Sequence, residues 1–257
     1  MTYDIADFQH ERDSSLAAKI MSSAAAQSIV GALHRNGLDR TYNYIYRACC
    51  PQLMPSNAPK IFELLSRVCG EFGLTTPPKI FVTRNYRETV SVRGLQEPFI
   101  LFSSEYLRKL DDVTLLGVIA GQIAAIRCQH HRILYLTWGI GYASALIPAA
   151  SLVIEPTIND WKRGRFFTYD KAFCLATGDQ KLALRNVMIN VVPAPIIDQM
   201  QYATAHDSFI DQAEHFVNGM ALMQSGIKRA VSMLSEKDWL PERYLEIKNF
   251  FERRRAK

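Results

Sequence analysis

Two adjacent histidines, His130 and His131, are the first side chains that could act as metal ligands or general bases. Imidazole changes its protonation near neutral pH, which suits both roles. Cys128 lies two residues before His130, and a cysteine–histidine pair is one arrangement for nucleophilic catalysis. Residues two apart on a helix do not face each other, however. The pattern therefore favours surface or hydrogen-bonded histidines over a nucleophile pair or a metal site.

A second group of potential metal ligands lies on a helix expected at residues 206–234. Its members are His206, Asp207, Asp211, Glu214 and His215. The three carboxylates share one helix face, but the set matches no metal-site template. A solvated helix face is the better interpretation. The motifs G-x-S-x-G, the P-loop and G-x-G-x-x-G do not occur in the sequence.

Composition limits the classes of function. The 257 residues are 48% hydrophobic and 21% charged, which is enough for a sizeable core in one large or two small domains. The net charge of +5 is spread among interleaved acids, which argues against nucleic-acid binding. The basic end, residues 253–257, is best explained as a solvated tail, with weak attraction to anionic lipid or RNA as the alternative.

The cysteines and the N-terminus bear on the compartment. Five cysteines without C-x-x-C spacing indicate neither a disulfide framework nor a zinc ribbon, and they fit a reducing compartment. The first 15 residues have no basic region followed by an apolar stretch, so no signal peptide is expected. The sequence thus favours the cytoplasm.

Any site must be positioned by the helix predicted from Asp111 to Arg132. Asp111 and Asp112 are good helix starters, because a carboxylate there meets unpaired amides and the positive end of the helix dipole. From residue 113 to 126 the only polar side chains are Thr114 and Gln122. A helix that is apolar on all sides is expected to be buried.

Other elements follow from periodicity and from proline and glycine punctuation. Helices are expected at residues 15–33, 60–72, about 104–110 and 181–190, and strands at 79–83, 89–93 and 98–102. Residues 1–15 are polar and expected to be loose, and the tyrosine-rich residues 41–47 suggest a short strand or an irregular segment. Prolines at 51, 55 and 59 argue against regular structure until about residue 58.

The run from Ile133 to Ile154 has 22 residues and no formal charge. A transmembrane helix needs roughly 20 apolar residues. Gly139, Gly141 and Pro148 weaken a continuous helix, however. A buried helical hairpin is therefore favoured over a membrane span, and membrane association stays an alternative.

The buried helix resembles the catalytic helix of HtpX-like gluzincin metallopeptidases, which carries H-E-x-x-H. In this comparison Gly121 takes the first ligand position, Gln122 that of the general base, and Ala125 the second ligand position. The segments NGLDR at 36–40, GLTTPPKIFV at 73–82 and SEYLRKLDDVTLLGVIAGQ at 104–122 also have family counterparts. The resemblance implies an α+β, mostly α-helical zincin fold with a small antiparallel sheet and a buried central helix.

A second family motif, E-x-x-x-D, lies on the helix after Trp161. Phe166 takes the place of the zinc-binding glutamate, while Asp170 matches the aspartate that supports the site from behind. The segment from Pro241 resembles the family's closing P-x-x-R pattern, although Arg243 lies one residue nearer to the proline than that pattern places its arginine. We expect Asp170 either to pair with Arg243 or to cap a backbone amide.

The resemblance implies a zinc site whose ligands this chain lacks. Glycine, alanine and phenylalanine offer no lone pair where three ligands are needed. The amide of Gln122 cannot take a proton near neutral pH. The sequence therefore predicts no metal, no cofactor and no peptidase activity.

In the family, the strand equivalent to residues 89–93 is a sheet edge that pairs with extended substrate through main-chain hydrogen bonds, which need no metal. The predicted binding residues are Thr89, Val90, Ser91, Val92, Arg93, Gly94 and Gln122. An ordinary edge strand is the alternative.

The prediction is a non-catalytic pseudopeptidase that binds an extended peptide or a partner protein in the former active-site cleft, as a scaffold or regulator of another enzyme. Residues 1–30 would be an N-terminal extension with the first helix, and residues 31–257 one metallopeptidase-like domain. Two alternatives stay open: an enzyme with rebuilt chemistry, and a membrane-embedded regulator anchored by residues 133–154.

Overall fold

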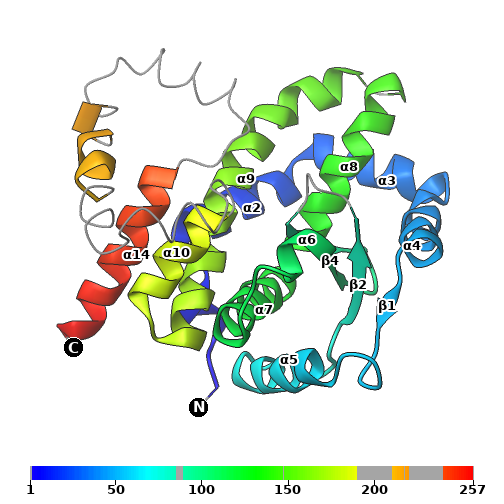
Figure 1. Cartoon of the computed structure of the whole chain (residues 1–257). Helices are drawn as coiled ribbons and strands as arrows, with labels where there is room; N and C mark the ends of the chain where they lie inside the picture. Colours follow the sequence, from blue (N-terminus) through cyan, green and yellow to red (C-terminus); the bar gives the residue numbers. More distant parts are fainter. Residues whose placement is uncertain are drawn as a thin grey trace.

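The chain folds into an α+β structure that is mostly helical, with one small sheet (Figure 1). The computed structural model describes residues 2–84, 89–146, 148–189, 210–216, 218–219 and 240–256. The first helices are α1 (Ile5–Phe8), α2 (Glu11–Ser22), α3 (Ala24–Arg35), α4 (Leu38–Cys49), α5 (Pro59–Glu71) and α6 (Ser104–Leu107). They are followed by α7 (Asp112–Arg127), α8 (His130–Leu146), α9 (Pro148–Thr177), α10 (Gln180–Ile189) and α14 (Leu240–Arg255). The strands are β1 (Gln52–Leu53), β2 (Lys79–Thr83), β3 (Val90–Arg93) and β4 (Phe99–Ser103).

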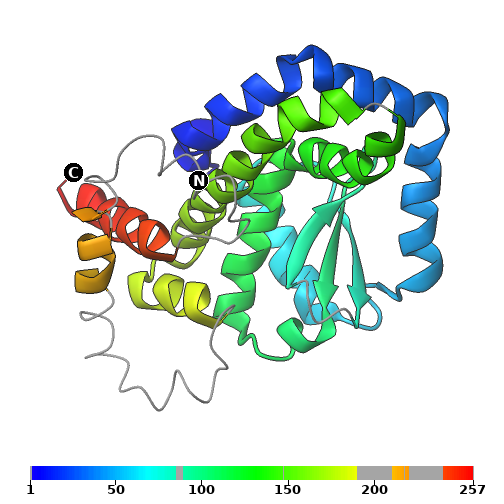
Figure 2. The same ribbon diagram turned by 90° about the horizontal axis from the view of Figure 1, so that it is seen from above.

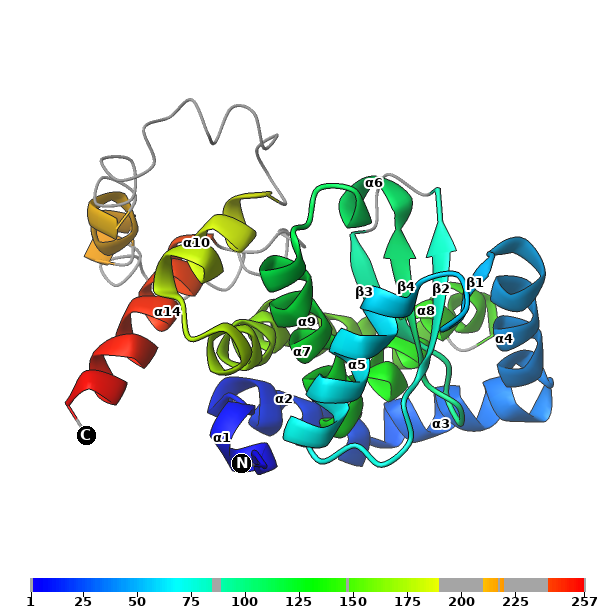
Figure 3. The ribbon, with the colours of Figure 1, turned by 60° about the horizontal axis from the view of Figure 1, so that its bottom comes forward.

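The sheet is mixed, with the strand order β1-β2-β4-β3. β2 and β4 run parallel, with Lys79 opposite Phe99, while β1 and β3 are antiparallel to their neighbours. The expectation of an antiparallel sheet was therefore wrong for its central pair. Strands β2, β3 and β4 were predicted within one residue, but local alternation does not reveal which strands pair. β3 forms an edge of the sheet and lies nearest to α7 and α9 (Figure 3).

Helix α7 is the buried central helix that the sequence predicts, but it ends at Arg127 rather than at Arg132. The Asp111 carboxylate accepts a hydrogen bond from the Thr114 amide at 2.7 Å, which fixes the start of the helix. Every residue from 114 to 126 is buried. The core on one face of the sheet combines α7 with α5 and with strand residues such as Ile80 and Ile100.

Helices α7 and α9 approach each other closely through two glycines one turn apart. A Cβ placed on Gly121 would lie 3.4 Å from the carbonyl oxygen of Tyr169. A Cβ on Gly117 would lie 2.5 Å from the buried ring of Phe173, closer than non-bonded atoms come. Gly117 therefore leaves space for the Phe173 ring, and Gly121 packs against the backbone of Tyr169 at contact distance.

The N-terminal residues are part of the folded core, contrary to the expectation of a loose start. Phe8 is fully buried, and its ring lies 5.3 Å from that of Phe72. The single helix expected at 15–33 is divided into α2 and α3, because the Ser23 hydroxyl accepts a hydrogen bond from the Ala26 amide and starts a new helix. Figure 2 shows α2 and α3 following each other along one side of the molecule.

Two further expectations were wrong in the same region. Residues 41–47 belong to α4, where Tyr46 packs on the second face of the sheet against Phe99, with ring centroids 5.7 Å apart. The prolines do not prevent the short strand β1, which pairs with β2. Both outcomes depend on tertiary contacts that override local pattern. The predicted break at 192–195 lies outside the described residues.

A buried polar network ties α2 to the core. Both oxygens of Asp13 are engaged: Trp161 Nε1 donates at 2.8 Å, Thr168 Oγ1 donates at 2.6 Å, and His130 Nε2 lies at 2.8 Å. Burial alone would raise the pKa of Asp13. The hydrogen bonds and charge of His130, with the bonds from Thr168 and Trp161, outweigh this and lower the pKa below 3.8.

The apolar run at 133–154 belongs to two helices. α8 ends at Leu146, and α9 begins at Pro148, a position that proline favours. In the described part of the chain no single helix is both long and apolar enough to cross a membrane. The pair α2 and α3, bent by 65°, meets that test together, on length and composition only.

We predict that Gly117→Ala destabilises the protein by about 1–3 kcal/mol, because the added methyl group must displace the ring of Phe173. Gly70→Ala is the matched control, since Gly70 lies in α5 with open space around it. There, alanine should stabilise by up to about 1 kcal/mol through its higher helix propensity. Urea unfolding of both variants measures the difference, and equal effects would contradict the close packing of α7 and α9.

We also predict that Asp13→Asn lowers the unfolding free energy at neutral pH by about 3 kcal/mol, because the buried partners lose their anion. The pKa of Asp13 is lower in the folded state, so its stabilisation is complete above the unfolded pKa of about 4 and is lost as pH falls through the folded value. Stability curves against pH should therefore fall less steeply below about pH 4 in the variant. Glu63→Gln, which removes an exposed carboxylate, should leave the slope nearly unchanged.

Candidate functional site

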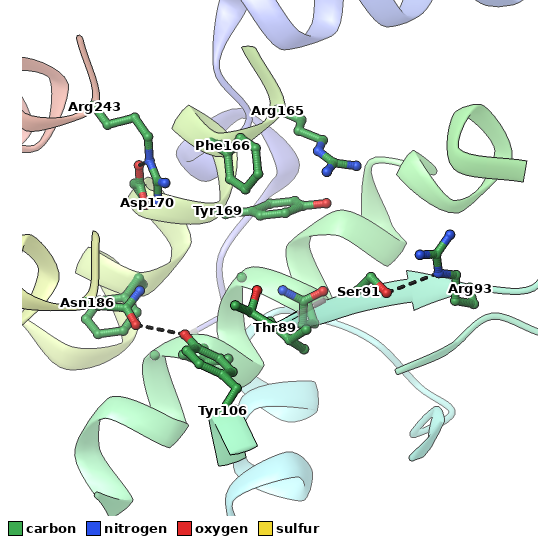
Figure 4. Close-up of a pocket in the computed structure, with 16 residues that line it drawn as sticks. Thr89, Ser91, Arg93, Tyr106, Arg165, Phe166, Tyr169, Asp170, Asn186 and Arg243 are labelled. Atoms are coloured by element: carbon green, nitrogen blue, oxygen red, sulfur yellow. Dashed lines mark hydrogen bonds and ion pairs between the residues drawn. The ribbon is translucent and has the colours of Figure 1, made fainter. Parts of the chain in front are cut away.

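A cavity of about 260 Å³ lies between the edge strand β3 and helices α7 and α9, and we call it the cleft. Figure 4 shows the side chains that line it. Tyr106, Asn186 and Arg243 complete the lining from the start of α6, from α10 and from α14. Segments far apart in the sequence therefore meet here.

The structure brings most of the predicted site residues together in this cleft. From β3 and the residue before it come Thr89, Val90, Ser91 and Arg93. From the helices come Gly121, Gln122, Phe166, Asp170 and Arg243. Three predicted residues do not line it: Val92 and Ala125 are fully buried in the core, and Gly94 is buried in a left-handed turn with φ of 87°.

The free edge of β3 is open at one end only. The Ser103 amide donates to the Thr89 carbonyl at 2.8 Å, so Thr89 faces β4. Because such positions alternate in an antiparallel ladder, the main-chain groups of Val90 and Val92 point to the opposite edge, where the described residues place no strand. Val92 is 0% exposed, whereas Val90 is partly exposed and lines the cleft. An added chain can therefore pair at Val90, and the ladder closes at Val92.

Gln122 presents an unsatisfied acceptor at the cleft. Its side chain is only 3% exposed, and its Oε1 has no hydrogen-bond partner. Leaving a buried polar atom unpaired costs about 1–3 kcal/mol. A ligand that donates an N–H to this oxygen would remove the cost.

Asp170 and Arg243 form a buried ion pair with two hydrogen bonds. Arg243 Nε donates to Oδ2 at 2.8 Å and Nη2 to Oδ1 at 2.7 Å, and both residues are 4% exposed. The pair connects α9 to α14, which confirms the first of the two alternatives expected for Asp170, pairing with Arg243 rather than capping of a backbone amide. The Arg243 guanidinium also lies 4.8 Å from the ring centre of Phe166.

Arg165 lies among aromatic rings on the other side of Phe166. Its guanidinium carbon is 5.0 Å from the ring centre of Phe166, 5.4 Å from that of Trp161 and 5.9 Å from that of Tyr169. These distances are typical of cation–π contacts. The Phe166 ring, at the position of the family's third ligand, thus lies between two guanidinium groups.

Hydroxyl groups supply further polar contacts. The Tyr106 hydroxyl donates to Asn186 Oδ1 at 3.0 Å, and Arg93 Nε donates to Ser91 Oγ at 3.1 Å. Burial raises the pKa of Tyr169 to about 12, although the nearby guanidinium groups of Arg165 and Arg93 lower it. The phenol is therefore protonated at neutral pH and can donate a hydrogen bond.

The cleft does not fit the zinc that the family resemblance implies. Among the described residues that line it there is no histidine or cysteine, and its one carboxylate, Asp170, is engaged by Arg243. Gly121 and Phe166 offer no donor atom, and Ala125 lies outside the cleft. Zinc needs at least three protein ligands, so the residues present cannot hold it.

Asp13, Cys128 and His130 place potential ligand atoms within 4.8 Å of one another, away from the cleft. The Asp13 oxygens are already hydrogen-bonded, and burial raises the pKa of Cys128 to about 12, so its thiol stays protonated. The geometry supports a hydrogen-bonded histidine, as the sequence favoured.

The acidic group on the predicted helix at 206–234 falls partly outside the described residues, which exclude His206 and Asp207. Asp211, Glu214 and His215 lie on a described helical segment, and Glu214 pairs with Lys248 at 2.8 Å. Metal-ligand geometry is not found in this group among the described residues.

Sequence reasoning missed several residues of the cleft. Tyr169 and Phe173 lie three and seven residues after Phe166, so helical spacing around that position would have found them. Arg165 lies one residue before Phe166, and that spacing does not predict it. Tyr106 and Asn186 are 80 residues apart, and nothing local in the sequence connects them.

No protein-family model, curated protein or solved structure matches this chain.

We predict that Asp170→Ala lowers the unfolding free energy by about 3–5 kcal/mol, because it leaves the Arg243 charge buried without a partner. The double variant Asp170→Leu with Arg243→Met should recover much of that loss. Arg67→Ala, which breaks the exposed pair with Glu71, should cost at most about 1 kcal/mol. If urea unfolding shows Asp170→Ala to be as mild as Arg67→Ala, the ion pair does not support the fold.

Proposed function

We propose that this protein is a non-catalytic relative of the HtpX-like metallopeptidases that binds an extended peptide or a partner's extended segment in the cleft. Its role would be to present or regulate that partner as a scaffold. The protein would bind peptides as members of that family do, but it would not cleave them.

The observation that carries the proposal is the unpaired Oε1 of Gln122 beside the open part of the β3 edge. An extended peptide has N–H groups for this acceptor and both N–H and C=O groups for the main chain of Val90. β-strand addition of this kind gains its affinity from main-chain hydrogen bonds. Both groups line the same cleft, so one short segment can satisfy them together.

The lining residues support binding without catalysis. A peptidase of this family needs a metal-bound water and a general base. The base position holds Gln122, and the ligand positions hold Gly121, Ala125 and Phe166. Gly121 packs against Tyr169. The guanidinium groups of Arg165 and Arg243 both pack on the ring of Phe166. These residues have structural roles that do not include activating water.

We predict that Arg93→Glu weakens peptide capture roughly tenfold, because the glutamate places a negative charge beside the edge at which a peptide with a negatively charged C-terminus would bind. The probe is a degenerate pool of octapeptides with free C-termini, captured by the immobilised protein and quantified by mass spectrometry. Lys19→Glu is the matched control: it makes the same change in charge on the exposed side of α2, away from the cleft.

Capture that is equal in Arg93→Glu and Lys19→Glu would place binding elsewhere on the molecule. Absence of capture by the unmodified protein would refute peptide binding altogether. Circular dichroism of both variants establishes that each is folded.

A further inference from the structure

Positive charge exceeds negative charge in the cleft. Its lining includes the three arginines Arg93, Arg165 and Arg243, and one acid, Asp170. The charge of Asp170 is taken by Arg243 through two hydrogen bonds. The cleft therefore presents two more positive charges than negative ones, and part of that excess lies away from the ion pair.

Arg165 has an unmet capacity to bind an anion. Its Nε is buried and has no hydrogen-bond partner, and within the described part of the chain no acid pairs with it. The Nε of nearby Arg163 also has no hydrogen-bond partner, but the charge of that residue is paired with Asp160 on the same helix. The rings around Arg165 hold its planar group in place, and a guanidinium held in this way is pre-organised to bind a carboxylate with two hydrogen bonds.

Arg93 and Tyr169 border the same space. In Figure 4 the Tyr169 hydroxyl points toward the side of the cleft where Arg93 and Arg165 lie. Both guanidinium groups lower the pKa of that phenol through their positive charge. A carboxylate in this space would meet the positive charge of Arg165 and could accept a hydrogen bond from Tyr169.

The shape of the edge indicates where a bound chain ends. Pairing is open at Val90 and closed at Val92, which is fully buried, so an added strand cannot continue along β3 past this end of the cleft. The cavity of about 260 Å³ is also smaller than the roughly 300–1,000 Å³ of typical small-molecule pockets. A chain terminus fits such a space better than the middle of a long segment.

We infer that the peptide held in the cleft is recognised by a carboxylate, which binds Arg165. The inference rests on the proposed function and specifies its ligand. The carboxylate can come from the C-terminus of the peptide or from an acidic side chain near its end. The closed edge at Val92 favours the C-terminus.

The test uses three octapeptide pools whose random positions contain only uncharged residues. The first pool has a free C-terminal carboxylate, the second a C-terminal amide, and the third an amide with glutamate as the last residue. The unmodified protein should capture the free-acid pool roughly ten- to a hundredfold better than the amide pool, because a charge-assisted hydrogen-bonded pair is lost with the carboxylate. The third pool should match the amide pool if the C-terminus is the group bound, and the free-acid pool if a side chain is bound. Either result supports recognition of a carboxylate, and the Arg165 variants test whether Arg165 binds it.

Arg165→Gln should remove the preference for the free acid while leaving weak capture of both pools. Arg165→Lys keeps the charge without the planar pair of donors, so an intermediate preference is expected. Arg67→Gln, on the exposed face of α5, makes the same change in net charge and should keep the full preference. If Arg165→Gln fails to fold, the preference for the free-acid pool over the amide pool is compared between the unmodified protein and Arg165→Lys. A reduced preference in Arg165→Lys would support the role of Arg165, and an unchanged one would contradict it.

Equal capture of the free-acid and amide pools by the unmodified protein would overturn the inference and leave peptide binding standing. Capture of neither pool would overturn the proposed function, and the inference with it. A preference that persists in Arg165→Gln would assign the carboxylate to another cation.

Discussion

The close approach of α7 and α9 at Gly117 and Gly121 is the contact on which the cleft depends. At Gly121 the two helices lie in contact, and they bring Gln122 on one and Phe166 on the other to the same cavity. A side chain at Gly117 would meet the ring of Phe173, and one larger than alanine at Gly121 would press against the backbone of Tyr169. The same contact gives a physical reason for glycine at the position that resembles a lost metal ligand.

The buried oxygens of Asp13 and Asp170 are hydrogen-bonded, whereas other buried polar atoms, in the core as well as in the cleft, have no partner. Asp13 has three side-chain partners and Asp170 is bound by both nitrogens that Arg243 offers, so these acids stabilise the fold. Gln122 and Arg165 each keep a buried polar atom without a partner. Because such atoms are costly to leave unpaired, their position at the cavity indicates where a ligand would add most stability. The unpaired acceptor and the unpaired donor together match an amide and a carboxylate, the two groups found at the end of a peptide.

The sequence predicted what depends on local pattern. The buried helix, the strands at 79–83 and 98–102 and the amphipathic helix at 60–72 follow from hydrophobic spacing and capping residues, and the Asp170–Arg243 pair followed from the family resemblance. The parallel pairing of β2 with β4, the burial of the N-terminal helices around Asp13, and the meeting of Tyr106 with Asn186 were not predictable in this way. Each joins residues far apart in the chain, and no local periodicity records such contacts. The binding edge was predicted as a whole strand, whereas packing in the core closes it at Val92.

The central claim is that the cleft binds a ligand without metal, because the residues that line it cannot coordinate zinc. Its most direct test is the metal content of the protein, purified without added metal or chelator, measured by inductively coupled plasma mass spectrometry. We predict that the purified protein contains no stoichiometric zinc or other transition metal. One tightly bound zinc ion per chain, removed by chelator together with a peptide-cleaving activity, would contradict it.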